Sequence, residues 1–340
     1  MENLSASVVI PAYNAKKTID FCLDSLVDQQ GYNQTLEILV IDDGSTDDTV
    51  EHIRKFQQRD LPANMTIKLL LQEHNQGPAA ARNRGAKEAS GDIILFTDSD
   101  CVVEVDWVKQ MLLPFVVDEV SAVKGAYKTR QPELIAKLAQ VEFDSRYQLL
   151  AKHEKIDVVF TYAAAIKKSV FWGLGGFDTS FPKADNEDTD LSYKIAKDHT
   201  IIFNPKAIVY HQHPATLKEY LSKKFSRGYW RMYVYKRFPK KAVQDSYTPQ
   251  SLKLQILLAY LMVITIIVIP FISNVYYVLL ILATIFILSV LPFLKIISFK
   301  NLDMLLFAPL FIYLRALVMG AGIISAIPGL IIDKKFTRLN

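Results

Sequence analysis

The chain has 340 residues, of which 51% are apolar, and its mean hydropathy of +0.16 is high for a soluble enzyme. The apolar excess falls after Ser251, so a water-soluble part is followed by a membrane part. The net charge is only +4, which argues against a nucleic-acid-binding protein. Basic residues are dense from Lys218 to Lys241, which indicates an anionic partner near the junction.

The N-terminal residues carry no cationic start and no long apolar run, so we expect no secretory signal and a cytosolic first domain. The two cysteines, Cys22 and Cys101, allow at most one disulfide, and we expect both to be reduced.

Strand and helix patterns alternate along the first hundred residues. Strands are predicted at Ser7–Ile10, Leu36–Ile41, Ile67–Leu71 and Ile93–Phe96, with helices around 19–27 and 50–56 and an alanine-rich helix at about 78–89. This alternation predicts an α/β fold, a Rossmann-like and mostly parallel sheet with helices on both faces. Ligands bind at the carboxyl ends of the strands in such sheets.

Two carboxylates end the fourth strand. Residues two apart on a strand face the same way, so Asp98 and Asp100 can address one point. They repel each other unless a cation or a shared proton neutralises them. Mg²⁺ is typically held by one or two carboxylates together with substrate phosphates. The pattern indicates a metal that holds a phosphate, although an isolated D-x-D is also common in solvated turns.

Polar groups also follow the first two strands, at Tyr13-Asn14 and at Asp42-Asp43. The G-x-G-x-x-G fingerprint and the Walker lysine motif are both absent, which argues against a dehydrogenase or an ATPase. The strand ends therefore favour a nucleotide site that handles phosphates through a metal.

Four segments together resemble the successive blocks of the family 2 inverting glycosyltransferases, which have the GT-A fold. They are Val9–Asn14, Val40–Asp47, Gly77–Gly85 and Thr97–Asp100, in that family's order over roughly the first two hundred residues. The resemblance implies a donor that is a UDP- or GDP-linked sugar and a cofactor that is Mg²⁺ or Mn²⁺.

The resemblance also implies roles for individual residues. Pro11, Tyr13 and Asn14 would border the nucleoside. Asp42 would accept a hydrogen bond from the nucleobase with Asp43 beside it, and Gly77 would line the donor site. Asp98 would face the ribose and the donor sugar, and it would share the metal with Asp100, which holds the metal on the diphosphate. Simple packing for Tyr13 and turn chemistry for Asp42 and Asp43 remain the alternatives.

Further strands are predicted at Val120–Tyr127 and Val158–Ile166, with a helix from Pro132 to about Lys152. Gly175 and Gly176 form a turn that allows close approach to a ligand, so we include Gly176 in the donor site.

An acidic segment, Asp185–Lys194, begins a helix. Transfer with inversion requires a base that takes the proton of the acceptor hydroxyl. In the resembling family an E-D pair at this place supplies that base, which implies Asp188 as the base and Glu187 or Asp190 in support. The alternative is that these carboxylates complement the helix dipole.

Two histidines, His211 and His213, follow the strand-like Ala207–Tyr210. A histidine can complete a metal site or donate to a diphosphate. The resemblance includes one histidine near here, and the sequence leaves open which of the two corresponds.

An amphipathic helix is predicted in the basic region 216–245. Lys223, Arg227 and Arg231 recur every four residues and can grip a lipid phosphate, or merely attract anionic lipid.

Apolar runs at 252–272 and 275–297 are long enough to span a bilayer. The positive-inside rule puts the enzyme in the cytoplasm. A third apolar segment, 304–332, either spans the membrane or is re-entrant. A clean span would export Lys334 and Lys335 against the positive-inside rule, which favours the re-entrant alternative. Its Arg315 suggests a polar role at a lipid phosphate.

The sequence thus predicts three parts: a cytoplasmic GT-A catalytic domain over 1–215, the interfacial region 216–245 and a membrane region over 246–340. We expect an inverting glycosyltransferase of the cell membrane that moves a sugar from a nucleotide diphosphate to a polyprenyl phosphate or a polyprenyl-diphosphate glycan. The rivals are a non-catalytic membrane scaffold and a glycoside hydrolase, which also uses two carboxylates. The sequence does not determine the donor sugar, the nucleobase of the donor or the oligomeric state.

Overall fold

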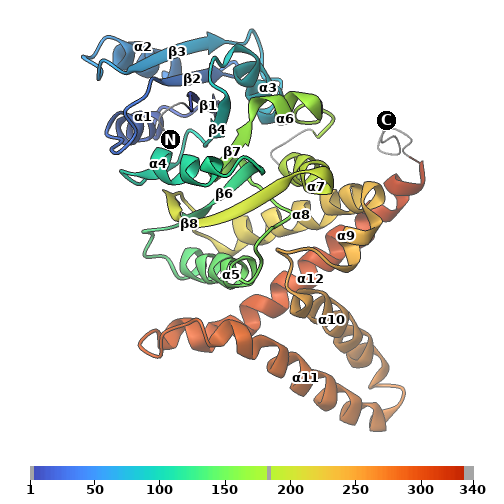
Figure 1. Cartoon of the computed structure of the whole chain (residues 1–340). Coiled ribbons are helices and arrows are strands. Elements are labelled where there is room, and N and C mark those ends of the chain that lie inside the picture. Colours follow the sequence, from blue (N-terminus) through green and yellow to red (C-terminus); the bar gives the residue numbers. More distant parts are fainter. Residues whose placement is uncertain (1–3, 182–184, 333–340) are drawn as a thin grey trace. The chain divides into compact units, whose positions relative to one another are not determined.

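The computed structural model describes residues 4–181 and 185–332, so Lys334 and Lys335 lie outside it (Figure 1). The chain forms two compact units. The first comprises the described residues up to Arg130 together with Ala151–Gln212, and the second comprises Gln131–Leu150 together with the described residues from His213. The helix near residue 140, which lies within the predicted catalytic range, thus belongs to the second unit.

The first unit is built on one eight-stranded sheet with the order β3-β2-β1-β4-β7-β6-β8-β5. The strands are β1 (Ala6–Ala12), β2 (Leu36–Asp42), β3 (Met65–Leu71), β4 (Ile93–Phe96), β5 (Val102–Val103), β6 (Val120–Lys128), β7 (Ala164–Lys167) and β8 (Thr200–Tyr210). Strands β1 to β4 pair in parallel, whereas β7 pairs antiparallel with β4 and β6. The predicted α/β class with a mostly parallel sheet is confirmed.

The strand order creates a topological switch point between β1 and β4. The chain runs from β1 outward to β3 and then returns past β1 to β4. Because crossovers between parallel strands are right-handed, helices α1 (Ile19–Val27) and α2 (Thr49–Gln57) cover one face and α3 (Pro78–Glu88) covers the other. The carboxyl ends of β1 and β4 therefore border the crevice where such sheets bind ligands.

The first unit has three further α-helices among its described residues. They are α4 (Trp107–Leu112), α6 (Lys168–Gly173) and α7 (Glu187–Asp198). One predicted strand, 158–166, is largely a loop: a 3₁₀ turn at Thr161–Ala163 precedes the short β7. A short buried apolar run satisfies strand and non-strand structure equally well, so this difference was not visible in the sequence.

A buried carboxylate stabilises the amino ends of the parallel strands. Glu37 on β2 accepts hydrogen bonds from Ser7 Oγ on β1 (2.5 Å), from the Ser90 backbone N–H (2.8 Å) and from Lys68 Nζ on β3 (2.7 Å). Burial alone would raise the pKa of Glu37, but these donors outweigh it and lower the pKa from 4.5 to about 2. The carboxylate thus ties β1, β2 and β3 together in its charged form.

The second unit is helical. Its helices are α5 (Leu134–Leu150), α8 (Leu217–Arg237), α9 (Pro239–Val243), α10 (Gln250–Val268), α11 (Tyr276–Leu294) and α12 (Leu302–Ile332). Helix α12 packs along α8 at close range, because a Cβ on Gly322 would lie 2.3 Å from the Phe225 carbonyl oxygen and a Cβ on Gly228 2.6 Å from that of Met319.

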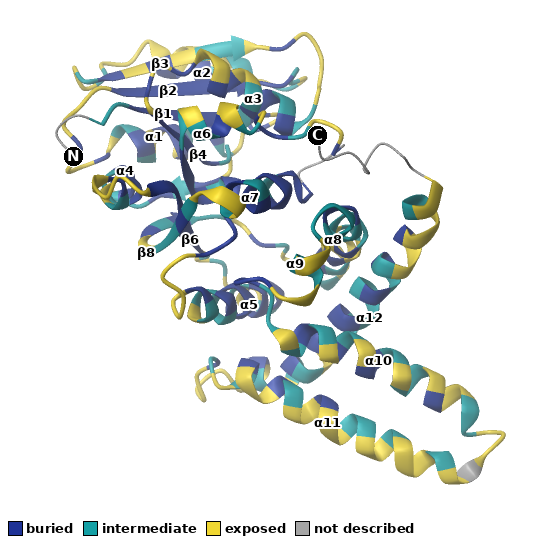
Figure 2. Ribbon diagram, turned by 45° about the vertical axis from the view of Figure 1, so that its right-hand side comes forward, coloured by how far each residue is buried: buried dark blue, intermediate teal, exposed yellow. Residues whose placement is uncertain are grey.

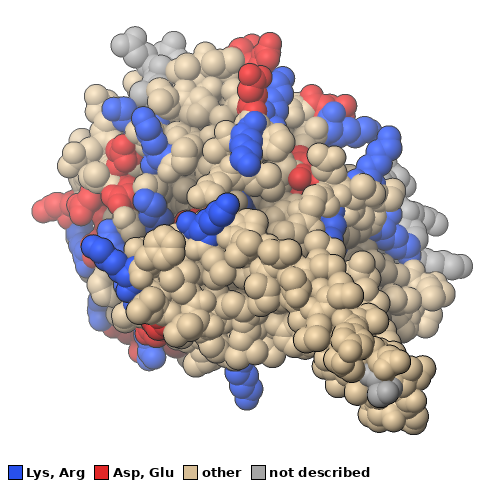
Figure 3. Space-filling view, turned by 90° about the horizontal axis from the view of Figure 1, so that it is seen from below, with Lys and Arg blue, Asp and Glu red and all other residues tan. Residues whose placement is uncertain are grey.

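Three helices of the described chain, α10, α11 and α12, are long and apolar enough to cross a membrane. Large apolar side chains such as Ile267, Leu280 and Leu288 are exposed on them, and Figure 2 colours much of α11 as exposed. In Figure 3 the projecting end of the α10–α11 hairpin carries no charged side chain on the visible face. Exposed apolar surface of this extent is suited to lipid.

The Glu37 cluster generates a prediction for stability. Because its pKa is lower in the folded chain than its ordinary 4.5, the charged carboxylate stabilises the fold above about pH 4.5, and this stabilisation is lost as the pH falls toward 2. We expect Glu37→Gln to lower the free energy of unfolding at pH 7 by about 1–3 kcal/mol and to weaken its dependence on acid pH. Thermal unfolding followed by circular dichroism at pH 7 and pH 3 measures both effects.

The matched control is Glu51→Gln, because Glu51 forms an exposed i,i+4 pair with Lys55. Its effect should stay within about 0.5 kcal/mol. Equal losses for the two variants would contradict the role assigned to Glu37.

Candidate metal and nucleotide-sugar site

Four side chains gather beyond the end of β4. Ligand atoms of Asp98, Asp100, Cys101 and His211 all lie within 4.8 Å of one another, and no other such group of three or more is found in the described chain. Asp98 and Cys101 follow β4, whereas His211 follows β8, so separate parts of the sheet supply them. The two carboxylates are the oxygen donors that Mg²⁺ and Mn²⁺ prefer, so they fit a hard divalent cation, and the imidazole adds a softer nitrogen donor.

His211 is oriented by a second residue. Its Nε2 lies 3.3 Å from Asp100 Oδ2, and its Nδ1 is hydrogen-bonded to the Tyr127 hydroxyl. When Nδ1 carries the proton and donates it to Tyr127, Nε2 presents a lone pair toward the carboxylates. A hydrogen bond at the far nitrogen is the usual way in which a metal-binding imidazole is fixed.

Arg82 on α3 connects the strand end with the acidic helix. Its guanidinium donates to Asp98 Oδ1 at 2.7 Å and to Glu187 Oε1 at 3.0 Å, and Arg82 is 3% exposed. Burial and the neighbouring Asp188 raise the pKa of Glu187 to about 7, against the opposing effect of Arg82. Oε2 of Glu187 is buried without a partner in the described chain. The first residue of α7, Glu187, is thus joined to the Asp98 carboxylate through Arg82, and Asp188 is the next residue of that helix.

The two carboxylates after β2 differ in their contacts. Asp43 accepts hydrogen bonds from the backbone of Gln76 (2.8 Å) and Gly77 (2.9 Å), so it orders the loop before α3. Asp42 accepts from the Ser45 backbone at 3.1 Å, while its Oδ1 is buried without a partner among the described residues. A buried unpaired acceptor is costly and is suited to a ligand N–H.

The other predicted donor-site residues surround the same strand ends. Asn14 has a φ of 50° and accepts from the Thr46 backbone at 2.9 Å, which joins the turns after β1 and β2. Tyr13 is 49% exposed and Pro11 partly so. Gly77 precedes α3 with a φ of 89°. Gly176 has a φ of 69°, which favours glycine.

The remaining predicted site residues lie in the second unit. His213 is buried, and its Nε2 lies 3.0 Å from Gln140 Oε1 on α5. On α8, Lys223 and Arg227 are exposed and Arg231 is partly buried. Arg315 on α12 is 5% exposed and donates to Gln255 Oε1 at 2.6 Å.

Four residues that take part in these arrangements were not predicted from the sequence to have a role in the site: Arg82, Tyr127, Cys101 and Asn83. Asn83 receives the Phe177 backbone N–H at 2.9 Å and so holds the Gly176 turn against α3. Arg82 and Asn83 stand inside the quoted block Gly77–Gly85, which was the available signal. Nothing in the sequence pairs Tyr127 with His211, because 84 residues separate them.

A mostly parallel sheet with acidic groups at its switch point defines an α/β protein with a candidate metal site at the strand ends. The Glycosyl transferase family 2 profile matches residues 7–175, so this part of the chain is a Glycosyl transferase family 2 domain. The fold is that of the mannosyltransferase PcManGT from Pyrobaculum calidifontis, solved with GDP-Man and Mn²⁺. That match has a TM-score of 0.60 and 19% identity over 98% of this chain and 88% of that one. The expected GT-A fold is thereby confirmed.

Two curated relatives are similar in sequence. Glycosyltransferase AglE of Haloferax volcanii is 27% identical over 201 residues, which cover 58% of this chain and 65% of AglE. The poly-beta-1,6-N-acetyl-D-glucosamine synthase of Staphylococcus epidermidis is 28% identical over 218 residues, which cover 62% of this chain and 50% of the synthase. The chain therefore spans half to two thirds of the length of these relatives.

The Arg82 bridge generates the prediction for this site. Replacing Arg82 by Gln leaves two carboxylates near one another without their cation, so we expect a loss of about 3–5 kcal/mol in the free energy of unfolding. The control Arg84→Gln changes an exposed arginine of the same helix and should cost less than about 0.5 kcal/mol. Chemical denaturation at pH 7.5 compares them, and a stable Arg82→Gln protein would refute the bridging role.

Proposed function

We propose that this protein is an inverting glycosyltransferase that takes sugar from a UDP- or GDP-linked donor with the help of Mg²⁺ or Mn²⁺. The observation that carries the proposal is the meeting of Asp98, Asp100 and His211 beside Arg82 and the start of α7. Candidate groups for the donor, metal and base functions thus come from the ends of β4 and β8 and from α3 and α7 of the first unit, which supports the proposal. The family 2 domain and the glycosyltransferase relatives support the same reaction class.

The acceptor is proposed to be a polyprenyl phosphate or a glycan on a polyprenyl diphosphate. Three apolar helices support an acceptor that is available at a membrane. Lysines flank them, with Lys240 and Lys241 ahead of α10 and Lys295 after α11, which favours a cytoplasmic side for the catalytic unit. The similarity to a polysaccharide synthase supports a role in polysaccharide or glycan assembly.

The chemistry follows from the groups present. Asp98, Asp100 and His211 would hold the cation, which supplies charge neutralisation on the departing diphosphate. Asp42 and the turns at Asn14 and Gly77 bind the nucleoside side of the donor. With the glycan acceptor, Asp188 removes the proton from the acceptor hydroxyl as the oxygen attacks the anomeric carbon from the face opposite the diphosphate. A polyprenyl phosphate would attack through a phosphate oxygen that is already ionised, so that acceptor needs no base.

Within the acidic trio of α7, Asp188 suits the base best. Asp190 is buried and paired with Lys194 at 2.8 Å, and Glu187 is held by Arg82. Asp188 is the partly exposed member of this trio, whereas Glu187 and Asp190 are buried, which favours Asp188 as the group that an acceptor would meet. Glu187 and Arg82 act by positioning this turn and the Asp98 carboxylate.

The base assignment predicts the behaviour of Asp188→Asn. A general base contributes about 10²–10⁴-fold, so sugar transfer to a hydroxyl of a glycan acceptor should fall by that factor while donor binding stays unchanged. The control Asp198→Asn lies at the exposed far end of the same helix and should transfer normally. Transfer of radiolabelled sugar to membrane lipid extract measures the rate. A scaffold without catalytic activity would give no transfer in any variant, and unimpaired Asp188→Asn would contradict the assignment.

The metal assignment predicts cation-dependent donor binding. Ligands that bind the native state raise the unfolding midpoint. UDP- and GDP-sugars should therefore raise the midpoint strongly when Mn²⁺ or Mg²⁺ is present and only weakly when EDTA has removed the metal. Asp100→Asn should weaken Mn²⁺ binding at least about tenfold, whereas Asp118→Asn, a fully exposed carboxylate, should not. Thermal shift and calorimetry provide both readouts. Absence of any nucleotide effect would favour the glycoside hydrolase.

A further inference from the structure

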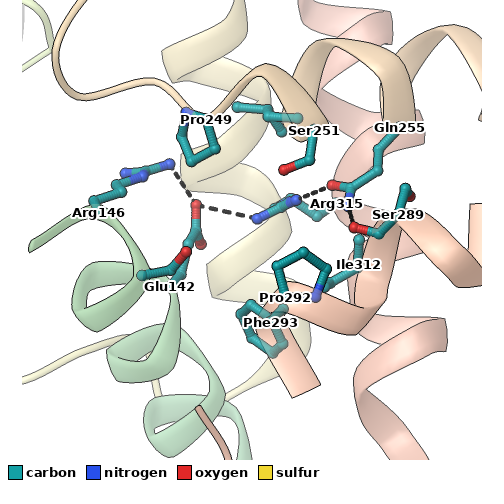
Figure 4. Close-up of a pocket in the computed structure, with 12 residues that line it drawn as sticks. Glu142, Arg146, Pro249, Ser251, Gln255, Ser289, Pro292, Phe293, Ile312 and Arg315 are labelled. Carbon is teal, nitrogen blue, oxygen red and sulfur yellow. Dashed lines mark hydrogen bonds and ion pairs between the residues drawn. The ribbon is translucent and has the colours of Figure 1, made fainter. Parts of the chain in front are cut away.

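The second unit contains a buried cluster of charges centred on Glu142 of α5 (Figure 4). One carboxylate meets Arg146 Nη2 at 2.5 Å, Lys224 Nζ at 2.8 Å and Arg315 Nη1 at 3.5 Å. The hydroxyl of Tyr220 also donates to it at 2.7 Å. Each of these side chains is less than a tenth exposed, so the cluster lies in a low-dielectric environment.

The cluster has more positive than negative charge. In the described part of the chain, Glu142 is the one carboxylate paired with Arg146, Lys224 and Arg315. Burial lowers the pKa of Lys224 well below its usual range, against the effect of Glu142. Even with Lys224 neutral, two guanidinium groups face one carboxylate. Uncompensated buried charge is unfavourable, so the arrangement favours an additional anion.

The two arginines also carry unsatisfied donors. The Nε atoms of Arg146 and Arg315 are buried and have no hydrogen-bond partner in the described chain. Both arginines line a pocket, together with the hydroxyl-bearing Ser145 and Ser251. The pocket also takes in Pro249, the residue before α10, whose helix N-terminus favours negative charge. These are donors of the kind that bind phosphate oxygens.

The other pocket residues show where the pocket stands relative to the apolar helices. Ser251 and Gln255 come from the first turns of α10, and Ser289 and Phe293 come from the last turns of α11. Because α10 and α11 form a hairpin, these turns are at the same end of two candidate spans (Figure 1). An end of that kind marks the boundary between hydrocarbon and headgroups, where lipid phosphates lie.

We propose that the pocket between Arg146 and Arg315 binds the phosphate group of an anionic membrane lipid. The two guanidinium groups and the serine hydroxyls donate hydrogen bonds to the phosphate oxygens. Gln255 holds Arg315 in place, because it accepts a hydrogen bond from Arg315 at 2.6 Å and donates one to the Ser289 carbonyl at 3.0 Å. Glu142 opposes the anion and limits its affinity. The site is separate from the proposed catalytic groups, all of which lie in the first unit.

The test measures lipid binding to the full-length protein in detergent, without donor or metal, by native mass spectrometry. The probes are phosphatidylglycerol, a polyprenyl phosphate, the matched uncharged polyprenol and inorganic phosphate. We expect both phosphate lipids to bind, the polyprenol to bind at least tenfold more weakly, and inorganic phosphate at equal concentration not to displace the lipids. Displacement by inorganic phosphate would assign the pocket to a free anion and overturn the lipid site.

Variants distinguish a binding site from a purely structural ion cluster. Arg315→Gln and Arg146→Gln should each weaken phosphate-lipid binding about tenfold or more. Lys295→Gln is the control for general attraction to anionic lipid, because it removes an exposed cation just after α11. It should not weaken phosphate-lipid binding. Loss in Lys295→Gln equal to that in the arginine variants would overturn the proposal.

Glu142→Gln should change lipid affinity in the opposite direction to the arginine variants, and misfolding cannot produce such an increase. Removing the opposing carboxylate should strengthen phosphate-lipid binding several-fold in the folded fraction, even though the ion pairs within the unit are weakened. A structural cluster predicts lower stability with unchanged or lost binding, and that result would overturn the proposal. Binding confined to the polyprenyl phosphate would identify the lipid as the proposed acceptor, whereas equal binding of phosphatidylglycerol would identify a general membrane lipid. Since no donor is present, none of these results bears on the glycosyltransferase activity.

Discussion

The structure of the first unit depends on how negative charge is balanced at the carboxyl end of β4. Asp98 has a cation on one side, the guanidinium of Arg82, at 2.7 Å. Ligand atoms of Asp100, Cys101 and His211 lie within 4.8 Å of Asp98 and bring no permanent positive charge. A divalent cation and an anionic diphosphate would complete this balance, because the metal attracts the carboxylates and the phosphates alike. The same arginine reaches Glu187, so the balance also fixes the start of α7.

The second unit poses the reverse problem, with buried positive charge in excess around Glu142. In both units a single buried group of the opposite charge, Arg82 or Glu142, joins several elements. Such groups contribute little net stability by themselves, but removing one leaves its partners uncompensated, and this makes them sensitive positions. The two units thus present complementary preferences, the first for a cation and the second for an anion.

Much of this was predictable from local patterns. The alternation of strands with amphipathic helices defined the sheet up to β4, and the two-residue spacing of Asp98 and Asp100 indicated a site because strand geometry makes spacing informative. Residues that act through long-range pairs were not predictable. Tyr127 reaches His211 across 84 positions, and Lys224 is buried against Glu142 across 82. Lys224 stands four residues from both Tyr220 and Gly228 on the buried face of α8. The helical spacing of these three residues was therefore a sequence signal that Lys224 is buried.

The sequence also presented Arg315 and the α8 cations as one lipid-binding group. In the structure Arg315 is buried beside Gln255, whereas Lys223 and Arg227 are exposed, so these cations have different surroundings. Hydropathy identifies an arginine in an apolar helix, but the carboxylate that it meets comes from α5, about 170 positions earlier, and is specified by tertiary packing alone.

The central claim is that a cation joins the Asp98–Asp100–His211 cluster to the nucleotide diphosphate. Phosphorus NMR of UDP and GDP in the presence of the protein and Mn²⁺ tests it most directly, because a paramagnetic ion relaxes phosphorus nuclei only at close range. The account predicts strong broadening of both diphosphate resonances of the bound nucleotide, and loss of that broadening in Asp100→Asn. Nucleotide that binds with its phosphorus resonances undisturbed would contradict the account.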